Sequence, residues 1–347
     1  MPVSRLPDLP KAEVAAEQRR QQIAQIRDYY TQLARLDNVA YRIRVANRQF
    51  CKTTAPQIGL RAATVRSLPR AFRSYTREAL RIGWNVPTAL SVADGSPAGV
   101  AGIKAGDQIL TFNNEVLPKA GTGKWIDRWL KTHGEKPVQI MVRRDGADAL
   151  RTVYPVVGCA IPIRYKTNPD PNAETNGKQI VIQSGILRIA RTDDELAVVI
   201  GHELAHANLG HYNKRVWNAV LGEFGGAMVD GGFMLGGIYT GRTFSRYFEK
   251  TGARAFSVEF EREADYVGSY YAARAGYDVA SAAEIWRALS LESPQSIRIA
   301  STHPITPARF VQMQKAAAEI ADKERRHLPL VPEMQKVQAA SSRDDGK

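Results

Sequence analysis

The sequence predicts an α+β protein, with a mainly helical domain and a small edge sheet preceded by a smaller domain rich in strands. Three patterns indicate this. Apolar residues recur at helical spacing after Thr192, short strand-like runs separated by turn signals fill residues 89–156, and residues 11–48 have the charged, periodic character of one long helix. A chain of 347 residues has the expected length for two domains and an N-terminal helical segment.

Residues 1–77 are predicted to form that N-terminal helical segment, packed on the C-terminal domain. The apolar residues Ile23, Ile26, Tyr30 and Leu33 follow one another at helical intervals and make a narrow stripe. The formal net charge of the chain is +13, and residues 1–77 contribute +10 of it, with 15 basic against 5 acidic residues. This predicts peripheral contact with an anionic membrane surface, although an ordinary solvated basic face is the alternative. No nucleic-acid motif is present, so a nucleic-acid partner is not expected.

Residues 78–157 are predicted to form the strand-rich domain. Residues 89–92, 109–112, 138–142 and 150–156 are typical of strands, residues 122–132 of a helix, and Arg144-Asp145-Gly146 of a turn. The segment from Ser96 to Leu110 resembles the signature of bacterial PDZ domains. That resemblance implies an inserted, β-barrel-like domain that binds extended peptides by strand addition. Arg81, Ile82, Gly83 and Trp84 are the candidate peptide-binding loop. The alternative is a degenerate PDZ domain that only packs against its neighbour.

Cys51 and Cys159 bracket the strand-rich domain and are the only cysteines. A disulfide between them would pin an inserted domain at its base, and two buried thiols are the alternative. An oxidising compartment favours pairing. Residues 1–25 are polar and contain no signal-peptide apolar region. We expect the periplasm or cell envelope, with a cytoplasmic location as the alternative.

The sequence His202-Glu203-Leu204-Ala205-His206 is the most specific motif in the chain. Positions i and i+4 share one face of a helix, so both imidazoles can reach one zinc ion, with the glutamate beside them as a base. Residues 192–195 match a capping box that would start this helix. A strand over residues 179–182, after a turn at Gly177, precedes it. A catalytic zinc site normally needs a third protein ligand.

Candidates for that ligand lie downstream. Glu261 and Asp265 share a face of a second predicted helix, and Ala264, Gly268 and Ala272 form a ridge of small residues along which another helix could approach closely. Gly276 is its predicted C-terminal cap. Glu263 points about 200° away from Glu261 on this helix. His211 follows His202 by nine residues, about half a turn away on a continuous helix, so we predict a structural or surface role for it.

Together these motifs resemble the zinc metallopeptidase (gluzincin) family of HtpX, BepA and the CAAX prenyl proteases, in its soluble branch. The resemblance also includes Asn172-Ala173, residues 185–187, Asp194 to Ala197, and His303-Pro304 with Arg309. The resemblance spans residues 160 to 320. It implies one Zn²⁺ per chain held by His202, His206 and Glu261, with Glu203 as catalytic base and Asp265 supporting a ligand imidazole. The implied fold is a zincin peptidase core over residues 158–328. We separately predict a disordered tail over residues 329–347.

Other roles stay open. His303 is a candidate oxyanion donor, a candidate reversible fourth zinc ligand, or a loop histidine, and Arg309 or a tyrosine near Tyr266 are further candidate donors. Residues 216–241 are apolar and glycine-rich, but Glu223 and Asp230 interrupt them. We therefore expect two short helices over the active-site cleft and not a membrane-spanning helix.

The predicted function is zinc-dependent endoproteolysis of unfolded or misassembled, cell-envelope proteins, with PDZ-mediated recruitment of protein or peptide substrates. The alternative is an envelope chaperone or assembly factor with little proteolysis. Glu203 favours the enzyme, because a pure binding protein has no need of a base.

Overall fold

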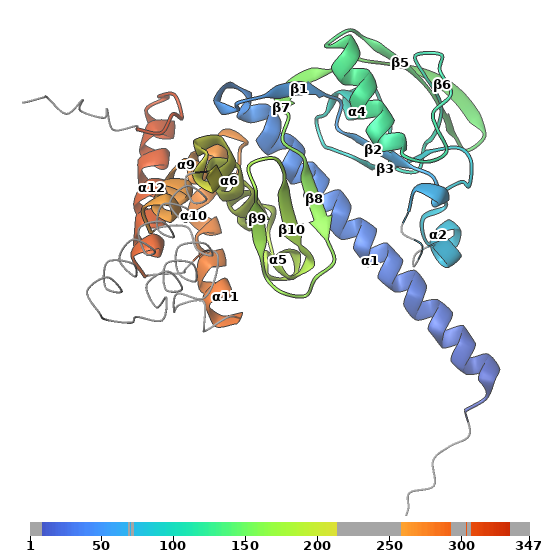
Figure 1. The fold of residues 1–347 in the computed structure, drawn as a ribbon, viewed down its shortest axis with the longest axis horizontal. Coiled ribbons are helices and arrows are strands. Elements are labelled where there is room, and N and C mark those ends of the chain that lie inside the picture. Colours follow the sequence, from blue (N-terminus) through green and yellow to red (C-terminus); the bar gives the residue numbers. More distant parts are fainter. Residues whose placement is uncertain are drawn as a thin grey trace, which may run out of the picture.

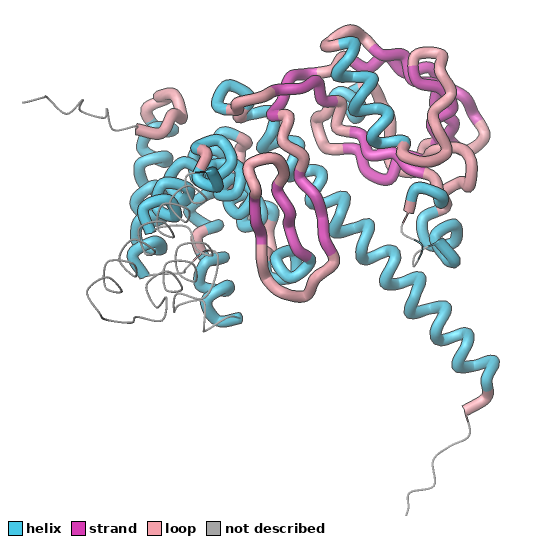
Figure 2. Tube along the Cα trace, viewed as in Figure 1, coloured by secondary structure: helices cyan, strands magenta, loops and turns pink. Residues whose placement is uncertain are grey.

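The computed structural model describes residues 9–68, 70, 73–213, 258–292, 303 and 307–333. The predicted apolar segment 216–241 lies outside these residues. Figures 1 and 2 show two groups of strands on either side of a long helix, with α6 and α9 to α12 gathered at one end and α2 and α4 beside the strands of residues 60–153. Within the described part of the chain, none of the helices combines the length and hydropathy needed to cross a membrane.

The long helix α1 (Lys11–Ala46) joins the two domains, and its start extends away from both (Figure 1). Its middle buries Ile26, Tyr30 and Leu33 in a cluster with Val65, Leu68 and Ile82. Its last turns bury Leu36, Val39 and Ile43 in the core of the C-terminal domain. Three of the four predicted stripe residues are thus buried, whereas Ile23 is only partly buried. They pack on the strand-rich domain, and only the following turns of α1 pack on the C-terminal domain as predicted.

The strand-rich domain contains a five-stranded antiparallel sheet in the order β2-β3-β4-β5-β6. The predicted strands and helix are present. The elements are β2 (Leu60–Ala63), η2 (Val65–Ser67), α2 (Arg73–Leu80), β3 (Thr88–Val92), α3 (Pro97–Val100), β4 (Gln108–Phe112), α4 (Thr122–His133), β5 (Val138–Arg144) and β6 (Ala147–Val153). The sheet begins with β2, upstream of the predicted boundary at residue 78. Its order is open, with β2 and β6 at the edges, so the barrel-like description is not confirmed.

A two-stranded ribbon lies where the chain enters and leaves this domain. After η1 (Arg48–Phe50), strand β1 (Thr54–Gln57) pairs antiparallel with β7 (Val156–Cys159), in a register that places Thr54 opposite Cys159. Cys51 and Cys159 form a disulfide across a sequence separation of 108 residues. The pairing considered from the sequence is thus present, and it closes the base of the strand-rich domain.

The C-terminal domain has a three-stranded sheet in the order β8-β10-β9, with helices packed beside it. Strand β10 pairs parallel with β8 and antiparallel with β9, which gives the predicted hairpin around Gly177. The elements are β8 (Ile163–Lys166), β9 (Ala173–Thr175), β10 (Ile180–Gln183), α5 (Ser184–Ile189), α6 (Asp193–Leu209), α9 (Val258–Arg274), α10 (Val279–Ala282), α11 (Glu284–Glu292) and α12 (Pro307–Arg325).

Residues 329–333 correct the predicted start of a disordered tail at residue 329. Arg274 on α9 donates to the carbonyl of Leu330, Lys323 on α12 donates to that of Val331, and the N–H of Glu333 donates to the Tyr266 hydroxyl. These contacts hold the segment against α9 and α12. Residues 334–347 lie outside the described part of the chain.

Candidate metal centre

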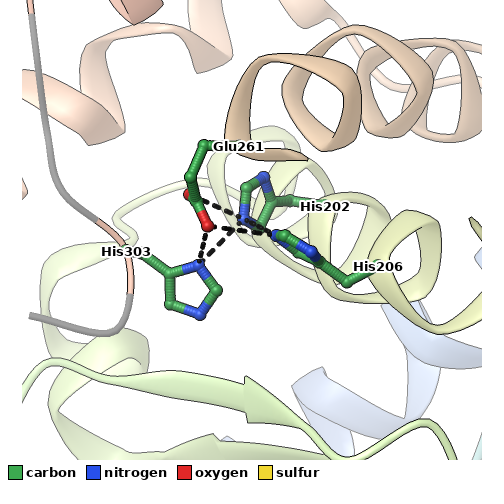
Figure 3. A group of neighbouring side chains, drawn as sticks. All are labelled: His202, His206, Glu261 and His303. Carbon is green, nitrogen blue, oxygen red and sulfur yellow. Dashed lines mark hydrogen bonds and ion pairs between the residues drawn. The ribbon is translucent and has the colours of Figure 1, made fainter. Parts of the chain in front are cut away.

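Helices α6 and α9 bring the three predicted ligands together. The capping box is formed as predicted: the Thr192 side chain accepts from the N–H of Glu195, whose carboxylate accepts from the N–H of Thr192. The helix that follows is buried along most of its length and carries His202 and His206. Figure 3 shows both imidazoles facing Glu261, which comes from α9, with His303 on the opposite side of the group.

The small-residue ridge of α9 sets the distance between these helices. A Cβ atom built on Gly268 would lie 2.6 Å from the backbone N of His202, and one built on Gly201 would lie 2.5 Å from the carbonyl oxygen of Gly268. Both positions must be glycine for the helices to approach this closely, since a methyl group on either residue would collide with backbone atoms of the other helix. Glu261, two turns before Gly268 on α9, is thereby carried to the histidines of α6.

The four side chains offer donor atoms at distances that suit one metal ion. His202 Nε2 lies 3.0 Å from His206 Nε2 and 3.6 Å from Glu261 Oε2, and His206 Nε2 lies 3.4 Å from Glu261 Oε1. His303 Nδ1 lies 2.9 Å from Glu261 Oε1 and 3.3 Å from His202 Nε2. Tetrahedral zinc with bonds of about 2.0–2.1 Å separates its ligand atoms by roughly 3.3 Å. The donor set therefore fits zinc, and among the described residues it is the one such group.

Asp265 and Arg309 contact two of the candidate ligands, His202 and Glu261. Asp265 Oδ1 lies 2.9 Å from His202 Nδ1, as the predicted role for Asp265 requires. Arg309 grips both oxygens of Asp265 at 2.7 and 2.8 Å and lies 2.8 Å from Glu261 Oε2. Burial opposes ionisation of Asp265, but Arg309 outweighs it and keeps the pKa of that carboxyl below its usual range. Arg309, a candidate oxyanion donor from the sequence, is itself buried and bound to both carboxylates.

His211 and Glu263 lie beneath the other ligand. His211 is fully buried, so the surface alternative for it is wrong. Its Nδ1 lies 3.0 Å from His206 Nδ1, and its Nε2 lies 3.0 Å from Glu263 Oε2. The half-turn offset assumed that the helix continues, whereas α6 ends at Leu209 and Gly210 adopts a left-handed conformation with φ +73°. That cap turns the chain back and places His211 under His206. The glycine before His211 was the available signal.

Burial and charge set the protonation of the group. Burial, with a smaller contribution from His202, holds the pKa of His206 well below its ordinary value, so this imidazole is neutral and has a lone pair to donate. Burial acts to raise the pKa of Glu261, yet His303 and Arg309 outweigh it and leave that pKa well below the usual range. An anionic carboxylate and neutral imidazoles are what a zinc site needs.

Glu203 lies beside the ligands and is not one of them. It is buried, and its Oε2 accepts no hydrogen bond from any described residue. Burial raises its pKa, as a carboxylate that exchanges protons near neutral pH requires. His303 Nε2 lies 3.5 Å from Glu203 Oε1, so the His303 ring stands between Glu203 and the ligand atoms.

Two further sets of candidate residues lie elsewhere. The Tyr266 hydroxyl donates to Glu319 at 2.8 Å, so that oxygen faces α12. The predicted peptide-binding loop, residues 81–84, lies between α2 and β3. Ile82 is buried in the cluster under α1, and the carbonyl of Gly83 accepts from the N–H of Val65, while Trp84 is 44% exposed.

Comparison with known proteins agrees with this site. Residues 163–317 match Peptidase family M48, and residues 88–144 match the PDZ domain. The mitochondrial metalloendopeptidase OMA1 of Arabidopsis thaliana is 33% identical over 131 residues, which is 36% of this chain and 25% of that protein. OMA1 of Saccharomyces cerevisiae is 26% identical over 161 residues, 42% of this chain and 44% of that protein. The matched part of the chain thus spans less than half the length of these relatives.

A crystal structure of the HtrA3 PDZ domain bound to a phage-derived ligand covers 30% of this chain and 88% of that one, at 25% identity and a TM-score of 0.24. The relatives found are OMA1 proteins, so the narrower assignment to HtpX and BepA is not confirmed. The family match and the relatives support the prediction of a metalloendopeptidase. Over residues 163–317 the chain is thus similar to peptidase family M48, and over residues 88–144 it is similar to PDZ domains.

Proposed function

We propose that this protein is a zinc-dependent endopeptidase that hydrolyses peptide bonds in unfolded or misassembled proteins. The observation that carries the proposal is the convergence of His202, His206 and Glu261 beside the buried Glu203, whose Oε2 accepts no hydrogen bond from any described residue. Three protein ligands leave a position for water, which is the arrangement of catalytic zinc sites. A site built only for stability would have no need of Glu203.

The chain's own residues would then divide the chemistry. Bound zinc supplies a Lewis acid that polarises the peptide carbonyl and makes water acidic. Glu203 takes the proton of the attacking water and passes it to the leaving nitrogen, a transfer that its raised pKa favours. Arg309 and Asp265 keep His202 and Glu261 in place throughout, since both carboxylates are held by one guanidinium.

His303 is placed for one of two roles. Its Nδ1 faces the ligand atoms, which suits a fourth ligand that closes the site, whereas its Nε2 faces Glu203, which suits stabilisation of negative charge during the reaction. Burial lowers the pKa of His303, but Glu261 and Glu203 together raise it above its ordinary value. Replacement of His303 separates the two roles, as described below.

We further propose that the PDZ domain recruits the substrate by strand addition. Strand β2 is at one edge of the five-stranded sheet, and α4 packs beside it. An edge strand next to a helix is the arrangement to which PDZ domains add an extended peptide. Under this proposal the peptide would pair with residues 60–63, instead of binding the loop over residues 81–84.

The setting is also a proposal. The disulfide supports an oxidising compartment, such as the periplasm or cell envelope. The basic segment over residues 1–77 would favour an anionic membrane surface nearby. An envelope chaperone with little proteolysis is the alternative, and the buried Glu203 beside the candidate ligands argues against it.

Glu203→Gln tests the enzyme. We expect zinc to remain bound at one equivalent while casein cleavage is abolished, because the base is lost and the ligands are kept. Glu135→Gln, an exposed change of the same kind, serves as the matched control and should cleave normally. Absence of cleavage by the unmodified protein at any pH, and also after His303→Ala, would contradict the proposal.

A further inference from the structure

The two histidine ligands contributed by α6 are supported in different ways. His202 meets the carboxylate of Asp265 directly, and Arg309 clamps that carboxylate. His206, by contrast, uses its Nδ1 to contact a second imidazole. It meets the imidazole of His211 at 3.0 Å, and His211 in turn meets Glu263 at 3.0 Å.

Hydrogen-bond directions follow from the metal site. If His206 binds zinc through Nε2, its proton is on Nδ1 and must be donated. His211 Nδ1 accepts that proton, so the proton of His211 is on Nε2. The Nε2–H then donates to Glu263, a carboxylate that accepts only. Each link has one donor and one acceptor, so the chain of three residues has a single consistent direction.

The surroundings hold His211 in this orientation. Its ring stacks on Phe260 with centroids 4.5 Å apart and planes 12° apart, and the left-handed Gly210 turns it beneath α6. Glu261, Glu263 and Asp265 all come from one helix. Helix α9 therefore supplies one candidate ligand, Glu261, and two supporting carboxylates. Asp265 supports His202 directly, and Glu263 supports His206 through His211.

We propose that His211 and Glu263 form a relay that fixes the tautomer and orientation of His206 and strengthens its bond to the metal. The inference rests on the proposed metal site. His211 and Glu263 are positioning residues, because they act through His206 and touch neither substrate nor metal. Outer partners of ligand histidines are typically worth about 10–100-fold in metal affinity.

Two substitutions at one position separate the two hydrogen bonds. Asparagine places an amide oxygen near the position of Nδ1 and can accept from His206, whereas glutamine places its amide near Nε2 and reaches Glu263 only. We expect His211→Gln to weaken zinc binding about 10–100-fold and His211→Asn to stay within about threefold of the unmodified protein. Glu263→Gln, on a side chain that is 39% exposed, should weaken it severalfold without disturbing packing. His327→Gln, at an exposed histidine, is the control.

The measurements are zinc affinity by competition with a chelator, and the histidine ¹H–¹⁵N spectrum of the zinc-loaded protein. The His206 Nδ1–H signal should persist in His211→Asn and be lost or move in His211→Gln, which a merely structural role would not produce. A folded His211→Gln and Glu263→Gln that both bind zinc as tightly as the unmodified protein would overturn the relay. A protein that binds zinc but cleaves nothing would overturn the proposed function alone, because both readouts here report the metal site without requiring cleavage.

Discussion

Gly268→Ala tests how the two helices build the site. The added methyl carbon would lie 2.6 Å from His202 N, 2.7 Å from His202 Cα and 2.8 Å from Gly201 C. Carbon atoms normally approach to about 3.5–4.0 Å, so α9 must move away from α6 by about 1 Å. All three atoms are backbone, so no side chain can rotate to relieve the collision.

The displacement matters because it is transmitted to Glu261. Metal–ligand distances tolerate changes of about 0.2 Å, and a 1 Å misplacement costs on the order of 100-fold in rate. Overpacking of a core typically costs about 1–3 kcal/mol. We therefore expect Gly268→Ala to be destabilised by that amount, to bind zinc more weakly, and to cleave casein about 100-fold more slowly.

Urea unfolding, chelator competition and casein cleavage measure these three effects. Gly123→Ala in α4 is the matched control, because nothing lies within 4 Å of the added methyl group, and alanine is the better helix former by about 0.5–1 kcal/mol. The same substitution should thus stabilise one helix and damage the other. A Gly268→Ala protein with unchanged zinc affinity and stability would refute the helix-contact explanation of the site.

Two other changes test separate features. His303→Ala should lower zinc affinity roughly tenfold and raise the rate of casein cleavage. The reason is that His303 Nδ1 lies among the ligand atoms, so its removal frees a position for water. Unchanged zinc affinity with a lower rate would instead assign His303 to charge stabilisation. Replacing Cys51 and Cys159 by serine should lower the free energy of unfolding by about 2–5 kcal/mol, since the disulfide links residues 108 positions apart in the sequence. A reductant should lower the urea midpoint of the unmodified protein and leave that of the variant unchanged. Equal midpoints for both proteins, with and without reductant, would count against the disulfide.

Features that depend on neighbouring residues were predictable from the sequence. The spacing of His202 and His206, the capping box at Thr192 and the shared face of Glu261 and Asp265 are consequences of helix geometry alone. The strands of the PDZ domain followed from alternation and turn residues. In each case the interactions that decide the structure join residues only a few positions apart, so the local sequence is enough to predict them.

Features that depend on residues distant in sequence needed the tertiary structure. Arg309 could be a donor to the substrate or a clamp on carboxylates, and only the packing of α12 on α9 decides for the clamp. Strand β2 lies before the predicted start of the strand-rich domain, yet it belongs to the five-stranded sheet because it pairs with β3.

His211 shows the difference most clearly. A helical wheel carried through Gly210 placed it on the wrong side, whereas the left-handed glycine ends α6 and returns the chain to His206. The sequence by itself thus determined the candidate metal-binding motif, whose geometry is contained within one helix. The tertiary structure alone decided the supports of that motif, because hydrogen bonds between α6, α9 and α12 depend on how the helices pack and not on any spacing within them.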